Sequence, residues 1–344
     1  MNVLPFEVLR LTVLQPRTLD VGPWTRDLGR WTLDLGRSLM SDSRAITLEV
    51  GQAVGRPEAR QDVRRVLREL FRNRAALIGL VILLGVAVSA ILAPVITPYD
   101  PVIQEITLRL KPPGWTDPGS RMHLLGTDHL GRDILSRLIF GARISLIIGL
   151  SAVAVAGTLG TLIGLVAGYR GGRVDDFCMR LTDTMLAMPF ILLALAVIAV
   201  LGPSLRNIIF VLGITSWVSY SRVVRAEMLT LRTREFVAAA KALGGGGGRI
   251  VFRHLLPNVL TPVIVIATLE VARMIILESA LSFLGLGVQP PTPTWGGMLA
   301  DGRAYLSTAW WLATFPGLSI MLTVLGINLL GDWLRDVLDP RLQL

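Results

Sequence analysis

The sequence predicts an all-α membrane protein with six transmembrane helices. Hydrophobic residues make up 52% of its 344 residues and charged residues only 17%, whereas ordinary soluble domains are about one-quarter charged. The polar residues are concentrated at the ends of long apolar runs. Because a soluble core of this length needs a polar surface to cover it, this pattern excludes a soluble enzyme.

Six apolar segments are predicted to cross the membrane as helices. Four of them contain no charged residue and exceed the roughly 20 residues needed to cross the hydrocarbon core. A fifth, 207–221, is short, but the flanking Arg206 and Arg222 can extend outward and lengthen it. The sixth, 259–284, is interrupted by three charged residues. The four uninterrupted segments are 75–97, 144–169, 184–205 and 304–331.

Arginines determine the predicted orientation. The formal net charge is +9, which in a membrane protein indicates arginines flanking the spans at the cytoplasmic face, and not nucleic-acid binding. Arginines crowd the start of the first span, so both termini of a six-span chain lie inside. The external loop 99–143 nevertheless carries six basic residues and conflicts with this rule.

The predicted domain organisation has four parts. Residues 1–60 form a poorly ordered N-terminal extension, whose tandem heptad at 24–37 leaves open a partner-binding arm. Residues 61–74 form a cytoplasmic amphipathic segment. The transmembrane permease domain covers 75–334, and 335–344 form a cytoplasmic tail.

Motifs for catalysis or cofactor binding are absent from the sequence. Cys178 is the single cysteine, and the three histidines form no HExxH or other close-spaced ligand set. The glycine run 244–248 lacks the Gly-Lys-Ser/Thr of a phosphate-binding loop. We therefore expect a non-catalytic chain that binds no metal or cofactor. A self-sufficient transporter or channel is the other alternative, but it tends to show internal repeats, and none is convincing here.

The inner loop 222–258 is the most informative segment. Residues 227–243 read as a helix that stops at Gly244. After the glycine run, 249–256 read as a short amphipathic helix ended by Pro257. Small alanines in the first helix permit close approach by a partner, although a generic helical loop is an alternative.

The spacing within this loop resembles the EAA signature of binding-protein-dependent ABC permeases, in which the loop docks on the ATPase subunit. Ala238 stands where that signature has glutamate, and Glu235, three residues earlier on nearly the same helix face, could replace it. The five-glycine turn is a second departure, because glycine is a weaker N-cap than serine or aspartate. The resemblance implies these coupling residues: Glu235, Ala238, Ala239, Ala240, Gly244, His254, Leu256, Pro257 and Asn258.

Further segments narrow the resemblance to the second permease of dipeptide, oligopeptide and nickel importers. It implies a type I ABC importer permease fold in a bacterial or archaeal inner membrane. The implied partners are a second permease subunit, two ATP-binding subunits and an external solute-binding protein, while the solute stays open. The segments are 125–137, 141–146, 277–287, 295–299 and 328–341.

Three charged residues interrupt the segment 259–284. Charged groups at membrane depth are costly and normally face a partner or water. At about 100° per residue, Glu270 and Arg273 are about 60° apart and can pair, and Glu278 lies on the same broad face. A role in the translocation path and a structural role are both open.

Overall fold

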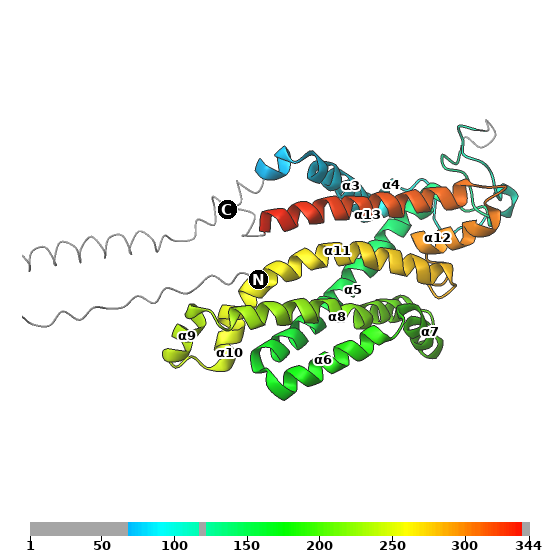
Figure 1. Cartoon of the computed structure of the whole chain (residues 1–344). Helices are drawn as coiled ribbons and strands as arrows, with labels where there is room; N and C mark the ends of the chain where they lie inside the picture. Colours follow the sequence, from blue (N-terminus) through cyan, green and yellow to red (C-terminus); the bar gives the residue numbers. More distant parts are fainter. Residues whose placement is uncertain (1–67, 117–121, 339–344) are drawn as a thin grey trace, which may run out of the picture. The chain divides into compact units, whose positions relative to one another are not determined.

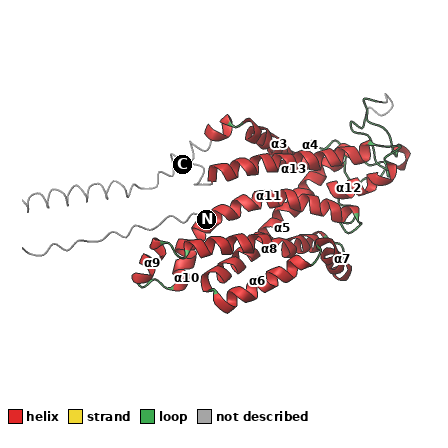
Figure 2. Cartoon of the chain, viewed as in Figure 1, coloured by secondary structure: helices red, strands yellow, loops and turns green. Residues whose placement is uncertain are grey.

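The computed structural model describes residues 68–116 and 122–338 (Figure 1). All of them belong to one compact unit, Arg65–Leu344. Its regular structure is helical, apart from an isolated bridge between Thr127 and Asp133 (Figure 2). The predicted extension 1–60, most of the segment 61–74 and the end of the tail lie outside the described residues.

Within the described ranges, five helices are long and apolar enough to span a membrane, and a bent pair supplies a sixth span. This confirms the all-α, six-span prediction. The bent pair is α6 (Gly172–Ala187) and α7 (Phe190–Leu201), which meet at 90°. The five are α3 (Arg74–Ile91), α5 (Ile134–Arg170), α8 (Leu205–Leu231), the helix Gly247–Phe283 that includes α11 (Leu256–Phe283), and α13 (Trp311–Leu338).

The predicted third span, 184–205, is wrong as a continuous helix. Pro189 cannot donate a backbone hydrogen bond, and a residue before proline is driven out of the helical region; Met188 has a ψ of 125°. The span also begins earlier than predicted, at Gly172. Its first half, α6, carries five charged residues, and a search for apolar runs therefore missed it.

Other span boundaries shift as well. Helix α5 begins at Ile134, before the predicted 144, because Asp133 caps it by accepting a hydrogen bond from the Ser136 N–H at 2.7 Å. Helix α8 runs on to Leu231, past the predicted 221. Helix α13 begins later than predicted, at Trp311, and continues to Leu338, so part of the predicted tail is helical.

The central packing contact joins α5 to α8 through glycines four residues apart. An added Cβ on Gly164 would lie 2.7 Å from the Ser221 carbonyl oxygen, and one on Gly168 would lie 2.5 Å from Met228 Cβ. Such close backbone approach is typical of small residues at transmembrane helix contacts. Helices α3 and α13 pack in the same way, at Gly79 against Gly326.

The two ends of the bundle differ (Figure 1). One end holds the start of α3, the end of α13, and the short helices α9 (Glu235–Ala242) and α10 (Gly247–Ile250). The opposite end holds α4 (Ala93–Ile96), α7 and α12 (Trp295–Gly302). The first is called the coupling end below, and the second the loop end.

Candidate functional site

The predicted inner helix 227–243 is divided in two by the structure. Helix α8 ends at Leu231 and α9 starts at Glu235, with Arg234 in an extended N-cap conformation. Arg232 donates a hydrogen bond from Nη1 to the Gly168 carbonyl oxygen at 3.1 Å. This bond holds the turn against the end of α5, so α9 is positioned by two spans.

Gly244 ends α9, as the sequence predicts. Its φ is +77°, in the left-handed region that suits glycine. The Gly244 N–H donates to the Lys241 carbonyl oxygen and the Gly245 N–H to that of Ala240, which is a Schellman motif. Nothing lies within 4 Å of an added Gly244 Cβ, so backbone conformation alone demands glycine here.

Pro257 does not end the second inner helix, which corrects the prediction. The chain continues from α10 through a π-helical turn, Val251–Leu255, directly into α11. Pro257 sits in the first turn of α11, where its missing N–H costs least. Asn258 donates from Nδ2 to the His254 carbonyl oxygen at 2.6 Å, and this bond adds a side-chain link across the junction.

Helix α9 has a buried face and an exposed face. Val237 is buried with Met228 of α8, Ile250 of α10 and Leu255 of the π-turn in one apolar cluster. The opposite face has no cover within the described residues and includes Leu243, 89% exposed. We name this the coupling surface; it consists of Glu235, Ala238, Ala239, Ala242 and Leu243, all exposed.

The remaining predicted coupling residues lie close to that surface. Ala240 is half-buried and packs against the apolar cluster beneath α9. His254 and Leu256 are half-buried, whereas Pro257 and Asn258 are exposed. The structure therefore brings the predicted set together at one end of the bundle.

The charged residues of α11 separate into two environments. Arg273 donates from Nη1 to Glu270 Oε1 at 3.1 Å, so the predicted pair forms. Its side chain is 53% exposed, while Glu270 is buried and its Oε2 has no hydrogen-bond partner in the described part of the chain. Glu278 is fully buried and accepts a hydrogen bond from Ser282 Oγ at 2.7 Å. It therefore presents no surface of this chain to a path.

A buried ionic cluster organises the loop end. Asp128 accepts hydrogen bonds from Arg132 Nε at 2.6 Å and Arg137 Nη1 at 2.9 Å. Asp301 of α12 lies 3.5 Å from Arg137 Nη2 and 3.7 Å from Arg132 Nη2. Two of the six basic residues that conflict with the charge rule are thus buried and neutralised. Asp301 was missed by sequence reasoning, since its partners are far away along the chain.

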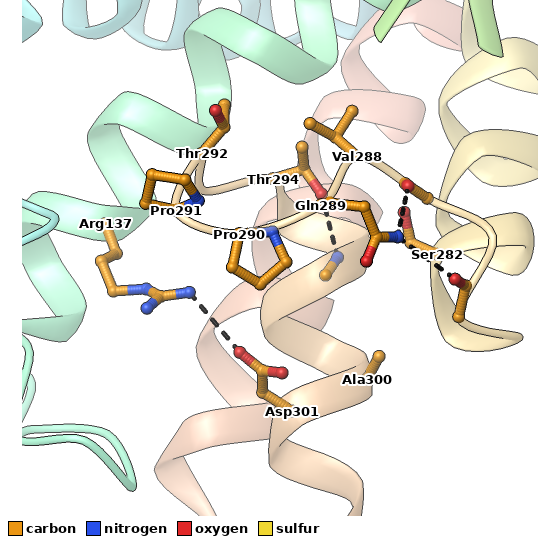
Figure 3. A pocket seen from close by; sticks show the side chains of 13 residues that line it. Arg137, Ser282, Val288, Gln289, Pro290, Pro291, Thr292, Thr294, Ala300 and Asp301 are labelled. Carbon is orange, nitrogen blue, oxygen red and sulfur yellow. Dashed lines mark hydrogen bonds and ion pairs between the residues drawn. The ribbon is translucent and has the colours of Figure 1, made fainter. Parts of the chain in front are cut away.

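A pocket of about 170 Å³ opens beside this cluster (Figure 3). Arg137 of α5 and Asp301 of α12 point toward each other on one side, and the loop between α11 and α12 forms the other. Gln289 on that loop donates from Nε2 to the Gly287 carbonyl oxygen at 3.0 Å. Burial raises the pKa of the Asp301 carboxyl, against the lowering effects of His129 and Arg132. The pocket has a mixed polar and apolar lining and lies at the end opposite the coupling surface.

These features define a multi-pass membrane protein with an exposed, alanine-rich helix face at one end and a pocket beside an ionic cluster at the other. The family described as "Binding-protein-dependent transport system inner membrane component" matches residues 160–344, and "N-terminal TM domain of oligopeptide transport permease C" matches 63–113. The chain belongs to this family of transport permeases, whose members are non-catalytic transmembrane components.

Similar proteins of named function cover most of the chain. It is 49% identical over 271 residues to "Di/tripeptide transport system permease protein DppC" of Pseudomonas aeruginosa, covering 79% of this chain and 89% of that protein. "Dipeptide transport system permease protein DppC" is 46% identical in Haemophilus influenzae and 47% in Escherichia coli K12, each over 79% of this chain. These alignments cover 92% and 91% of those relatives, respectively.

Proposed function

We propose that the chain forms one half of the membrane path of an ATP-driven importer for peptides. The identity of 45–49% to proteins named for di- and tripeptide or dipeptide transport carries this proposal. A second permease would complete the path, two ATP-binding subunits would supply the energy, and an external solute-binding protein would deliver the peptide. The chain itself would bind no cofactor, metal or nucleic acid.

The coupling surface is the proposed contact with an ATP-binding subunit. The alanines let a partner approach the α9 backbone closely, and Leu243 offers an apolar contact that is otherwise exposed to water. Because Val237 locks α9 to α8 and to the base of α11, a displacement of α9 would be passed to two spans. Closure of the ATP-binding subunits would thus shift the bundle between inward-open and outward-open states.

The remaining predicted coupling residues have supporting roles in this proposal. Glu235 is on the coupling surface three residues before Ala238, which occupies the position of the signature glutamate, and would take over the role of that glutamate. Gly244 ends α9 at the Schellman turn. Ala240 and Leu256 pack against the apolar cluster beneath α9. His254, Pro257 and Asn258 would support the junction where the chain enters α11.

Substitution of Ala239 tests the coupling role. Ala239→Arg places a long charged side chain on the coupling surface, so we expect loss of the ATP-binding subunit from the purified complex and loss of peptide uptake. Ala226→Arg is the matched control, since Ala226 is an exposed helical alanine of α8 outside the coupling surface. Full retention of the ATP-binding subunit and normal uptake in Ala239→Arg would refute the coupling role. A complex purified without any ATP-binding subunit would favour a self-sufficient transporter.

We further propose that the coupling end is cytoplasmic and that both termini lie there. The neutralisation of Arg132 and Arg137 by aspartates supports this orientation, because buried ion pairs add no net charge to the loop end. A reporter fused after Asn258 or at the C-terminus should read as cytoplasmic, and one near Asp117 as external. An external C-terminal reporter would overturn the orientation.

For α11 we propose that the Glu270–Arg273 pair meets the path or the second permease through the exposed Arg273 side chain. Glu278 would act from within the subunit. An added Cβ on Gly296 would lie 3.1 Å from Glu278 Oε2, so this carboxylate is at the contact between α11 and α12. It would shape the loop end of the path by holding α12 in place.

A further inference from the structure

We infer that one face of α6 lines a water-filled inner half of the transport path. The inference rests on the proposed function and adds to it the helix and the residues that meet the moving solute. We name this face the polar stripe; it consists of Asp176, Arg180, Asp183 and Thr184 of α6, together with Arg222 of α8, all exposed.

The polar residues of α6 share one side of the helix. At about 100° per residue, Arg180 and Asp183 lie within about 40° of Asp176, and Thr184 lies about 80° from it. Asp175 and Thr182 occupy the packed side and are buried. Asp175 accepts a hydrogen bond from Arg225 Nη2 of α8 at 2.6 Å, which orients α6 on the bundle.

The polar stripe extends into the membrane. Asp183 Oδ1 accepts a hydrogen bond from Arg222 Nη2 at 2.6 Å, so the two residues are at the same level. Next to Arg222, Ser221 packs against Gly160 and Gly164 of α5. These glycines precede the end of the apolar run at Tyr169 by about 8–14 Å along the helix axis. The ion pair is therefore in the inner half of a hydrocarbon layer about 30 Å thick.

Lipid cannot cover this face at low cost. The side chains of Arg222 and Asp183 are 50% and 66% exposed, and charges at membrane depth normally face protein or water. Asp176 and Arg180 have no ion-pair partner among the described residues. Because an unpaired charge is costly in a dry protein contact, water is a better cover than a tightly packed neighbouring subunit.

The chemistry of the polar stripe suits a peptide in water. Two carboxylates and two guanidinium groups give it no net charge, so it would neither repel nor trap a zwitterion. The adjacent side of α6 has a different character, with Phe177 69% and Leu181 41% exposed. Leu181 lies about 140° from Asp176 and about 60° from Thr184. It is apolar and suits lipid, which makes it a control on the same helix.

Thiol labelling tests the inference. The single cysteine is first removed by Cys178→Ser. Single cysteines are then placed by R180C, D183C and T184C in the stripe and by L181C beside it. The tagged chain is expressed in its own cells, so that native partners are present. Inside-out vesicles are treated with methanethiosulfonate ethylsulfonate, a membrane-impermeant thiol reagent. We expect the stripe positions to react at least tenfold faster than L181C.

Two results would overturn the inference. Equal, slow reaction at all four positions would place the stripe in lipid. Slow reaction in the assembled complex but fast reaction in the isolated chain would make it a subunit contact. T184C removes no charge and therefore stays informative if D183C fails to fold. The labelling measurement does not depend on peptide uptake. If the complex shows the expected labelling pattern but imports no peptide, the proposed cargo is refuted and the water-lined face still stands.

Discussion

The contact between α5 and α8 offers a direct quantitative test, through Gly164→Ala. An added Cβ would lie 2.7 Å from the Ser221 carbonyl oxygen and 2.7 Å from Val224 Cβ. Ordinary contacts begin at 3.4 Å, so the helices must separate by the difference, 0.7 Å. Backbone atoms on α8 cannot rotate away as a flexible side chain would, and the whole interface has to give.

The expected cost follows from two opposing terms. Overpacking a close-packed contact costs typically 1–3 kcal/mol, while alanine is favoured over glycine within a helix by about 0.8–1 kcal/mol. Gly157→Ala carries only the second term, because Gly157 is in the same helix and its added Cβ would lie at an ordinary contact distance, 3.5 Å, from the nearest ring atom of Tyr220. The difference between the two variants, about 1–3 kcal/mol, is then the packing cost alone.

Unfolding of the purified chain in a mild detergent, titrated with sodium dodecyl sulfate and followed by tryptophan fluorescence, measures this difference. Gly164→Ala should unfold at lower denaturant than the parent chain, and Gly157→Ala at the same or higher denaturant. If Gly164→Ala is as stable as Gly157→Ala, the close approach of α5 and α8 at Gly164 is wrong.

Three further substitutions test other parts of the structure. Gly244→Val should strain the Schellman turn by about 1–2 kcal/mol, because a β-branched residue must adopt a positive φ. Limited proteolysis after α9 should become faster. Gly246→Ala, at a φ of −64°, should leave the rate of proteolysis unchanged. Arg273→Ala leaves the buried Glu270 without its ion pair, at a cost of about 1–3 kcal/mol. The yield of assembled complex should fall in this variant and recover in Arg273→Ala/Glu270→Gln. An unchanged yield in the single variant would contradict burial of Glu270. Asp128→Asn removes the negative charge that neutralises two buried guanidinium groups and should destabilise the loop end by about 3–5 kcal/mol. Thermal unfolding should show this loss of stability. Asp100→Asn, at an exposed residue, is the control and should unfold as the parent chain does.

Local pattern was sufficient for much of the fold. Long apolar runs identify spans because a helix must satisfy its own backbone hydrogen bonds in lipid, and the six-span class is confirmed. The end of α9 at Gly244 was also readable, since only glycine readily takes the left-handed conformation of that turn. The order and spacing of short motifs identified the family without any tertiary information.

Hydropathy failed to identify a spanning helix that contains many charged residues. Helix α6 carries charged residues and lies on α8, yet a search for apolar runs places the span only from 184 onward. The π-turn before Pro257 was likewise invisible, because a proline can either end a helix or begin one. In both places, packing against neighbouring helices outweighs the local conformational preference of the sequence.

By itself, the sequence determined the class of protein, the family and the segment that bears the coupling surface, since each depends on residues close together along the chain. Only the tertiary structure decided which charges neutralise one another. Arg137 meets Asp301, and Asp183 meets Arg222, across helices that are distant in sequence. An ion pair depends on separations of a few ångströms, and helix packing alone sets those separations. For the same reason, the depth of the polar stripe in the membrane can be assigned only from the packing of α5 against α8.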